Sequence, residues 1–169
     1  MKTILIVGGG AAGMMAAYAA AKEKQRVILL EKNEKLGKKL YITGKGRCNI
    51  TNASDMENLF ANVVSNRKFL YSAFYTFDNM QVLSFFEENG LELKTERGNR
   101  VFPASDHSSD VIVTLVKVLK KLGVEIHLNT EVKELLLKRE TSCDGTQENK
   151  VCGVLCLNGE KIQADAVLV

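Results

Sequence analysis

The chain has 169 residues, of which 46% are hydrophobic and 25% are charged. These proportions are typical of a globular protein and exclude a disordered tail, a collagen-like chain and a disulfide-rich miniprotein. Lysine and arginine number 23 against 20 aspartates and glutamates, which gives a net charge of +3. So small an excess does not indicate a nucleic-acid-binding protein, which needs a clustered basic face.

The N-terminus and the cysteines predict a cytoplasmic protein without membrane contact. The apolar run Ile4–Val7 is too short for a secretory signal, and no stretch approaches the ~20 apolar residues of a membrane span. The cysteines form no C-x-x-C pair, and neither histidine lies at metal-ligand spacing from them, so we expect free thiols and no metal site. They are Cys48, Cys143, Cys152 and Cys156.

Residues 1–31 predict one βαβ unit. The apolar run Ile4–Val7 favours a strand buried on both faces of a parallel sheet. Three glycines follow, then an alanine-rich helix over 11–24 and a second buried strand over 26–30. Residues 33–54 are polar and rich in glycine, which predicts a long functional loop with a short helical turn near residues 38–41.

The remaining sequence predicts helices first and then strands. Helices are expected over 56–64, 67–77 and 79–89, followed by a hairpin of 91–95 with 100–102. Ser108 or Ser109 is expected to cap a helix over 110–122, which leads to a strand over 124–128. An antiparallel meander is predicted over 130–139, 150–158 and 160–163, with a polar loop at 140–149, and a last strand begins at Asp165.

The first glycines carry the first chemical signal. Gly8, Gly10 and Gly13 form a G-x-G-x-x-G pattern that follows a strand and opens a helix, as in sites that bind a dinucleotide pyrophosphate. Glu31 ends the second strand, where a carboxylate can accept the hydroxyls of an adenosine ribose and disfavours the 2′-phosphate of NADP. The alternative is a glycine-rich turn beside an ordinary surface glutamate, which the strand–turn–helix context disfavours.

The long loop separates FAD from NAD as the expected cofactor. An NAD domain would continue its parallel sheet soon after the second strand, whereas here a glycine-rich loop and a helical insertion intervene. Gly44 and Gly46 let backbone N–H groups face phosphate or ribityl oxygens, and Arg47 suits a phosphate or the flavin edge. Asn49 can pair with an amide-like edge such as the flavin pyrimidine.

Two kinds of side chain in this loop have competing interpretations. Lys38 and Lys39 add positive charge near the pyrophosphate, or else form a solvated charge pair. Cys48 lacks the nearby second cysteine of a disulfide reductase, so we interpret it as a packed thiol and not as a redox centre.

Residues 37–52, GKKLYITGKGRCNITN, resemble the G-[RK]-K-x-x-x-[ST]-G-x-G-R-C-N-x-T-N signature of the HI0933-like (BaiN/RdsA) family of FAD-dependent oxidoreductases. Residues 100–106, RVFPASD, and residues 111–132 are also similar to segments of that family. The resemblance implies that the backbone of Val132 lies at the adenine. It also implies a continuation into a flavin-contacting A-T-G-G turn and a substrate domain, so we expect this chain to be the N-terminal portion of a longer protein.

The predicted fold class is α/β, a Rossmann-like FAD-binding domain incomplete at its C-terminus. Its expected parts are 1–31 (βαβ), 32–58 (flavin loop), 59–107 (helical and hairpin insertion), 108–128 (helix and strand), 130–164 (meander) and 165–169 (start of a further strand). The predicted cofactor-binding residues are Gly8, Gly10, Ala11, Ala12, Gly13, Glu31, Lys32, Lys38, Lys39, Gly44, Gly46, Arg47, Cys48, Asn49 and Val132.

The resemblance implies a flavoprotein that passes hydride from NAD(P)H to a small organic acceptor, such as a conjugated carbon–carbon double bond. Some members of the family carry an amine-oxidase-type label instead. The alternatives are a truncated, non-catalytic nucleotide-binding fragment and an NAD-only domain, the latter disfavoured by the loop at 37–52. The sequence assigns no catalytic residue and no oligomeric state.

Overall fold

The computed structural model describes residues 1–141 and 147–169. The chain divides into two compact units. The first unit comprises Met1–Lys38 and Leu115–Val169, and the second unit comprises Lys39–Thr114. Cys143, one of the expected free thiols, lies outside the described residues; Cys48, Cys152 and Cys156 are free.

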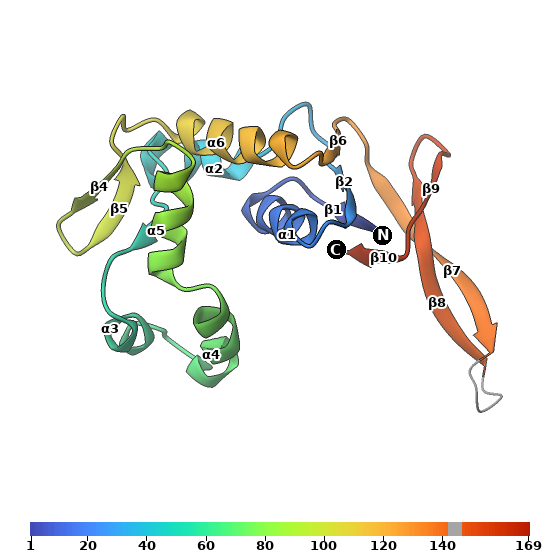
Figure 1. Cartoon of the computed structure of the whole chain (residues 1–169), viewed down its shortest axis with the longest axis horizontal. Helices are drawn as coiled ribbons and strands as arrows, with labels where there is room; N and C mark the ends of the chain where they lie inside the picture. The colour runs from blue at the N-terminus through green and yellow to red at the C-terminus, as the bar shows by residue number, and fades with distance from the viewer. Residues whose placement is uncertain (142–146) are drawn as a thin grey trace. The chain divides into compact units, whose positions relative to one another are not determined.

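A four-stranded parallel sheet forms the centre of the first unit (Figure 1). Its strands, in spatial order, are β10 (Ala166–Leu168), β1 (Thr3–Val7), β2 (Arg26–Leu30) and β6 (Glu125–His127). The β1 and β2 strands pair over their whole length, with Thr3 opposite Arg26 and Val7 opposite Leu30. The predicted βαβ unit is therefore confirmed, with α1 (Ala11–Lys22) joining the two strands.

Both faces of the sheet are covered. Successive side chains of a strand point to opposite faces, so each strand contributes apolar side chains to both. On one face, Leu5, Ile28 and Leu30 form a buried cluster with Val154 and Cys156 of the antiparallel meander. On the other face, Ile6 lies beneath Gly13 of α1. The apolar runs of β1 and β2 thus have the two-sided burial that their sequences predict.

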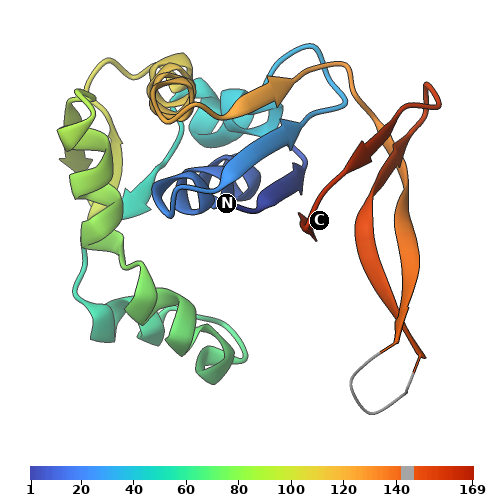
Figure 2. The ribbon, with the colours of Figure 1, turned by 45° about the vertical axis from the view of Figure 1, so that its right-hand side comes forward.

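The antiparallel meander is confirmed, with strand order β7-β8-β9. It consists of β7 (Val132–Thr141), β8 (Gln147–Cys156) and β9 (Lys161–Gln163), and Figure 2 shows β7 and β8 as a long hairpin followed by β9. Both long strands extend further than expected, so the predicted polar loop at 140–149 is wrong at its two ends, and its centre, 142–146, lies outside the described residues.

The second unit holds short helices and a three-stranded antiparallel sheet in the order β3-β5-β4. The chain runs through α2 (Lys38–Ile42), a 3-10 turn (Thr43–Gly46), β3 (Thr51–Asn52), α3 (Met56–Ala61), α4 (Arg67–Thr76), α5 (Asn79–Glu88), β4 (Leu93–Glu96) and β5 (Arg100–Pro103). The helices and the hairpin agree with the prediction. Asn79, buried at the start of α5, donates to the carbonyls of Asn52 and Ser54 and fixes the chain between β3 and α3.

The last helix, α6 (Ser108–Lys121), contributes its first residues to the second unit and its later residues to the first. The predicted serine cap is wrong, because the helix already includes Ser108. Its buried hydroxyl donates instead to the carbonyl of Tyr41 in α2 (3.1 Å).

Candidate functional site

The glycine turn between β1 and α1 leaves open space at two of its glycines, Gly8 and Gly10. Gly8 has a φ of 103°, which glycine adopts readily, and its N–H donates to the carbonyl of Leu30 (2.7 Å). A Cβ atom at Gly13 would lie 1.9 Å from the carbonyl oxygen of Gly8, whereas a Cβ at Gly10 would meet nothing within 4 Å. Gly13 therefore permits close packing, and Gly10 leaves room beside the backbone.

The N-terminus of α1 has the electrostatic character of an anion site. Gly10 is the N-cap residue and supplies no side-chain cap, and the first turn contains no acidic residue. Ala11 and Ala12 are exposed in that turn. The first N–H groups and the positive end of the helix dipole therefore face no competing protein carboxylate from this turn.

Glu31, at the end of β2, is buried against the glycine turn. One carboxylate oxygen accepts from the N–H of Gly9 (2.7 Å), and the other accepts from the backbone N–H (2.8 Å) and the side-chain amide of Asn33. Burial raises the pKa of Glu31, but the hydrogen bonds from Asn33 and Gly9 outweigh it, so its pKa lies below the ordinary value. Glu31 is therefore ionised at neutral pH, with about one of its four acceptor positions left for a ribose hydroxyl.

Three residues that the sequence pattern did not indicate complete this turn: Gly9, Asn33 and Leu36. The carbonyl of Gly9 accepts from the N–H of Gly37 (2.8 Å), and a Cβ at Gly9 would lie 2.2 Å from Leu36. The only available signal for Gly9 was its position as the middle glycine of the run Gly8–Gly10. Nothing in the local sequence indicated Asn33 or Leu36.

Lys32, Lys38 and Lys39 are exposed, and for Lys38 and Lys39 this exposure agrees with the alternative of a solvated charge pair. Lys38 forms an ion pair with Glu34 (2.9 Å) and donates to the side chain of Asn33 (3.1 Å). Lys32 helps lower the pKa of Glu31 through its charge. The positive charge of Lys38 is thus shared with an acidic neighbour on its own segment.

The glycine-rich loop in the second unit has an unusual backbone. Gly44, Lys45, Gly46 and Cys48 all have positive φ values, of 55°, 58°, 87° and 61°. The Cys48 thiol is 2% exposed, and burial raises its pKa, in keeping with a packed thiol. The side-chain nitrogen of Asn49 faces the carbonyls of Val101 (3.1 Å) and Thr51 (3.0 Å), which ties the end of the loop to β5 and β3.

Arg47 has partners that the sequence did not indicate. Its guanidinium donates to Glu96 (2.7 and 3.3 Å) and to Asp106 (3.1 Å), and it lies 4.1 Å from the centre of the Phe102 ring. The phosphate or flavin edge expected for this side chain thus has two carboxylates as competitors.

The predicted residues fall into the two units described above. The first unit holds Gly8, Gly10, Ala11, Ala12, Gly13, Glu31, Lys32, Lys38 and Val132. The second holds Lys39, Gly44, Gly46, Arg47, Cys48 and Asn49. Val132 is the first residue of β7 and lies opposite Cys156. It also packs against the buried cluster that includes Cys156 and Val154, which fixes the start of the strand.

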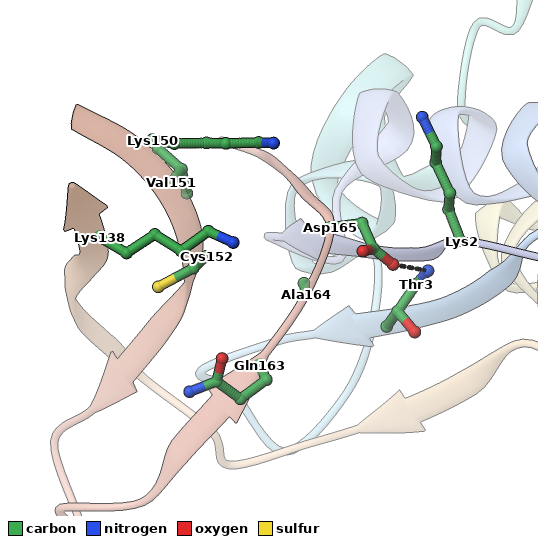
Figure 3. Close-up of a pocket in the computed structure, with 9 residues that line it drawn as sticks. All are labelled: Lys2, Thr3, Lys138, Lys150, Val151, Cys152, Gln163, Ala164 and Asp165. Carbon is green, nitrogen blue, oxygen red and sulfur yellow. Dashed lines mark hydrogen bonds between the residues drawn. The ribbon is translucent and has the colours of Figure 1, made fainter. Parts of the chain in front are cut away.

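A cavity of about 590 Å³ in the first unit includes none of the predicted residues (Figure 3). It lies at the start of β1, beside Lys2 and Thr3, whereas the glycine turn follows the end of that strand. Among residues 1–141 and 147–169, no group of three or more His, Cys, Asp or Glu side chains is placed to hold a metal ion. None of the described helices is both long and apolar enough to cross a membrane.

The parallel sheet, the glycine turn and the acid at the end of β2 define a Rossmann-type α/β protein. Within that class the chain belongs to the HI0933-like family: the family profile described as "HI0933-like protein Rossmann domain" matches residues 2–169.

The comparison with curated proteins found relatives that are much longer than this chain. The 3-dehydro-bile acid delta(4,6)-reductase of Clostridium scindens is 33% identical over 144 residues, which cover 85% of this chain and 32% of that protein. The ribosomal RNA dihydrouridine synthase of Escherichia coli is 28% identical over 108 residues, 64% of this chain and 26% of that protein. The chain therefore spans about a third or less of the length of these relatives.

Solved structures share the fold at low identity. A 3-ketosteroid-delta4-(5alpha)-dehydrogenase from Rhodococcus jostii RHA1 gives a TM-score of 0.66 at 14% identity, over 98% of this chain and 43% of that one. The THI4 protein of Thermovibrio ammonificans gives a TM-score of 0.63 at 18% identity, over 98% of this chain and 55% of that one. These similarities support the α/β fold assignment.

Proposed function

We propose that this chain is the FAD-binding portion of a flavoprotein oxidoreductase that passes a hydride from a reduced nicotinamide cofactor to an organic acceptor. The observation that carries the proposal is the open backbone at Gly10, beside an acid-free helix start and a buried, ionised Glu31. These residues fit the ADP half of FAD, because a pyrophosphate needs N–H donors without a side chain in the way.

Each group of residues has a distinct task in this proposal. The first N–H groups of α1 bind the pyrophosphate, and the remaining acceptor position of Glu31 takes a ribose hydroxyl. The loop that includes Gly44 and Gly46 would supply backbone N–H groups for the flavin half. When bound, FAD supplies two-electron chemistry, accepting and donating a hydride equivalent.

The acceptor we propose is a small molecule with a conjugated carbon–carbon double bond. The names of the two curated relatives, a delta(4,6)-reductase and a dihydrouridine synthase, both describe a reduced double bond. The bile acid reductase is the relative that covers more of this chain, which favours a small molecule over RNA. Reduction of uridine in ribosomal RNA, with no reduction of small enones, would contradict this choice.

The cofactor is tested on the natively expressed protein. We expect it to purify yellow and to release FAD on denaturation, identified by chromatography. We also expect added NADH or NADPH to bleach the flavin in the absence of oxygen. Bound nicotinamide nucleotide without any flavin would overturn the assignment.

The Gly10→Val variant tests the pyrophosphate turn. Gly10 has a φ of −80°, which valine tolerates, and a Cβ there meets nothing within 4 Å, so the fold should persist while the bound flavin is lost. The matched control is Ala19→Val, which adds the same side chain on the exposed face of the same helix and should retain flavin. If Gly10→Val keeps full flavin content, the turn has only a structural role.

A further inference from the structure

A cluster of five charged side chains joins the glycine-rich loop to the β4–β5 hairpin. The Arg47 guanidinium donates from two nitrogens to the two carboxylate oxygens of Glu96, at 2.7 and 3.3 Å. Its Nη1 also donates to Asp106 (3.1 Å), whose other oxygen accepts from Lys94. Arg100 adds a third cation, 3.9 Å from Glu96, so each of the two carboxylates is paired with two cations that hold it in place.

Phe102 of β5 gives this cluster an apolar base. The ring is 2% exposed, and the guanidinium carbon of Arg47 lies 4.1 Å from its centre, within the range of a cation–π contact. The same ring would lie 3.3 Å from a Cβ atom at Gly44. Both the start and the end of the loop 43–49 thus pack on one buried aromatic side chain.

The backbone of this loop requires such support. Lys45 and Cys48 adopt positive φ values, which are unfavourable for non-glycine residues and persist only where the surroundings determine them. Arg47 lies between these two residues. The N–H of Cys48 donates to the carbonyl of Thr43 (3.1 Å) and that of Ile50 to the carbonyl of Val101 (2.9 Å), so Arg47 adds a charged side-chain anchor to these backbone bonds.

The electrostatics of the two acids agree with a permanent anchor. The hydrogen bond from Arg47 lowers the pKa of Glu96, and those from Lys94 and Arg47 lower the pKa of Asp106. Both acids are therefore ionised at neutral pH. Asp106 itself has a φ of 61°, a conformation that aspartate and asparagine tolerate better than most residues.

From this geometry we infer that Glu96 and Asp106 are positioning residues: through Arg47 they hold the loop 43–49 in the conformation that binds the flavin. The inference rests on the proposed function, because the flavin is the ligand that the loop serves. It adds the β4–β5 hairpin, which lies outside the loop signature, to the determinants of flavin affinity.

The test is a double-mutant cycle on the natively expressed protein, with FAD as the titrated ligand. Glu96→Gln removes one charge at nearly constant shape, and Asp106→Asn does the same while keeping a residue that tolerates the positive φ. We expect either variant to raise the FAD dissociation constant about tenfold and to shift the visible spectrum of the bound flavin. In the Arg47→Met background, Glu96→Gln should change the constant by less than about threefold, because its effect passes through Arg47.

The matched control is Glu140→Gln in the meander. Glu140 also bridges two cations, Lys138 (2.6 Å) and Lys150 (2.9 Å), but it lies at the opposite end of β7 from Val132 and contacts none of the predicted cofactor-binding residues through these ion pairs. Its FAD affinity should stay at the wild-type value. If Glu96→Gln and Asp106→Asn bind FAD like wild type with an unchanged spectrum, or if Glu96→Gln acts equally with and without Arg47, the inference is wrong. A wild-type protein that binds no FAD would instead overturn the proposed function.

Discussion

At the scale of single residues, the glycines of one motif have different physical roles. Gly10 stands beside open space, whereas Gly13 stands against the carbonyl of Gly8. One substitution applied to both positions therefore separates packing from ligand access.

We expect Gly13→Ala to destabilise the fold by about 1–3 kcal/mol, because its Cβ would lie 1.9 Å from a backbone oxygen and the turn must shift. Gly10→Ala should stay within about 0.5 kcal/mol of wild type, since its Cβ meets nothing within 4 Å. Urea unfolding followed by circular dichroism measures both values. Equal stability of the two variants would show that the turn relaxes freely.

The cysteines offer a second prediction at this scale. Burial raises the pKa of Cys48, which shifts the thiol toward its neutral, unreactive form at pH 8, and its 2% exposure restricts access. We expect Ellman's reagent to modify Cys152, which is partly buried, well before Cys48 in the native protein, and both at similar rates after unfolding. Mass spectrometry of digested samples assigns each site. Early modification of Cys48 would contradict a packed role.

The pH dependence of this thiol follows from the same shift. A raised pKa in the folded state means that the unfolded chain releases the proton first as pH rises. The contribution of Cys48 to stability is therefore complete below its unfolded pKa of about 8.5 and decreases above it. Cys48→Ser should flatten this alkaline decrease.

The sequence predicted the local arrangement of those candidate site residues that lie close together along the chain. The glycines and Glu31 belong to one βαβ unit, so their spacing in the sequence determines how they are arranged in the turn. The partners of Arg47 lie 49 and 59 residues away along the chain, at Glu96 and Asp106. No local pattern encodes such contacts, because they depend on how the hairpin folds against the loop.

At the scale of elements, the predicted bounds agree best with the structure where an apolar pattern is directly followed by residues that end a helix or strand. The β2 strand has the predicted bounds, and α1 ends two residues before its predicted end. The β7 and β8 strands are displaced from their predicted bounds of 130–139 and 150–158, because they cover Val132–Thr141 and Gln147–Cys156. Their pairing contains register shifts at Val132/Glu134 and Leu136/Leu137, which interrupt the alternation of side chains. The exposed charged residues of these strands, at the ends nearest 142–146, also have the polar composition expected of a loop.

The α5 helix has a complete capping box, which gives a prediction for this element. The Asp78 side chain accepts from the N–H of Gln81 (2.7 Å), and the Gln81 side chain accepts from the N–H of Asp78 (2.8 Å). We expect Asp78→Ala to destabilise the second unit by about 1 kcal/mol, and Asp78→Asn by much less, since asparagine also caps well. Thermal unfolding of the two variants provides the measurement, and equal losses would indicate that the cap contributes little.

At the scale of the whole chain, the sequence predicted the α/β class and the order of elements but not the spatial order of the strands. The β10 strand pairs with β1, from which it is separated by most of the chain, and β6 pairs with β2. Right-handed crossovers permit several such arrangements. The strand order that forms depends on contacts with the side chains of β8 and β9, which cover one face of the sheet. These contacts join residues far apart in the sequence, so no local pattern predicts them.

This dependence yields a prediction for the chain as a cooperative structure. Val154 of β8 is fully buried against Leu5, Ile28 and Leu30, so Val154→Ala removes two methyl groups from the contact between meander and sheet. We expect a loss of about 2 kcal/mol in unfolding free energy. Leu137→Ala on β7, where the side chain is 57% exposed, is the matched control and should cost well under half as much.

Hydrogen exchange shows which elements the Val154→Ala substitution affects. The amides of β1, β2, β7 and β8 should lose protection together, because the parallel sheet and the meander share one core. Loss of protection confined to β7–β9 would show that the meander unfolds as a separate unit and that the parallel sheet is stable without it.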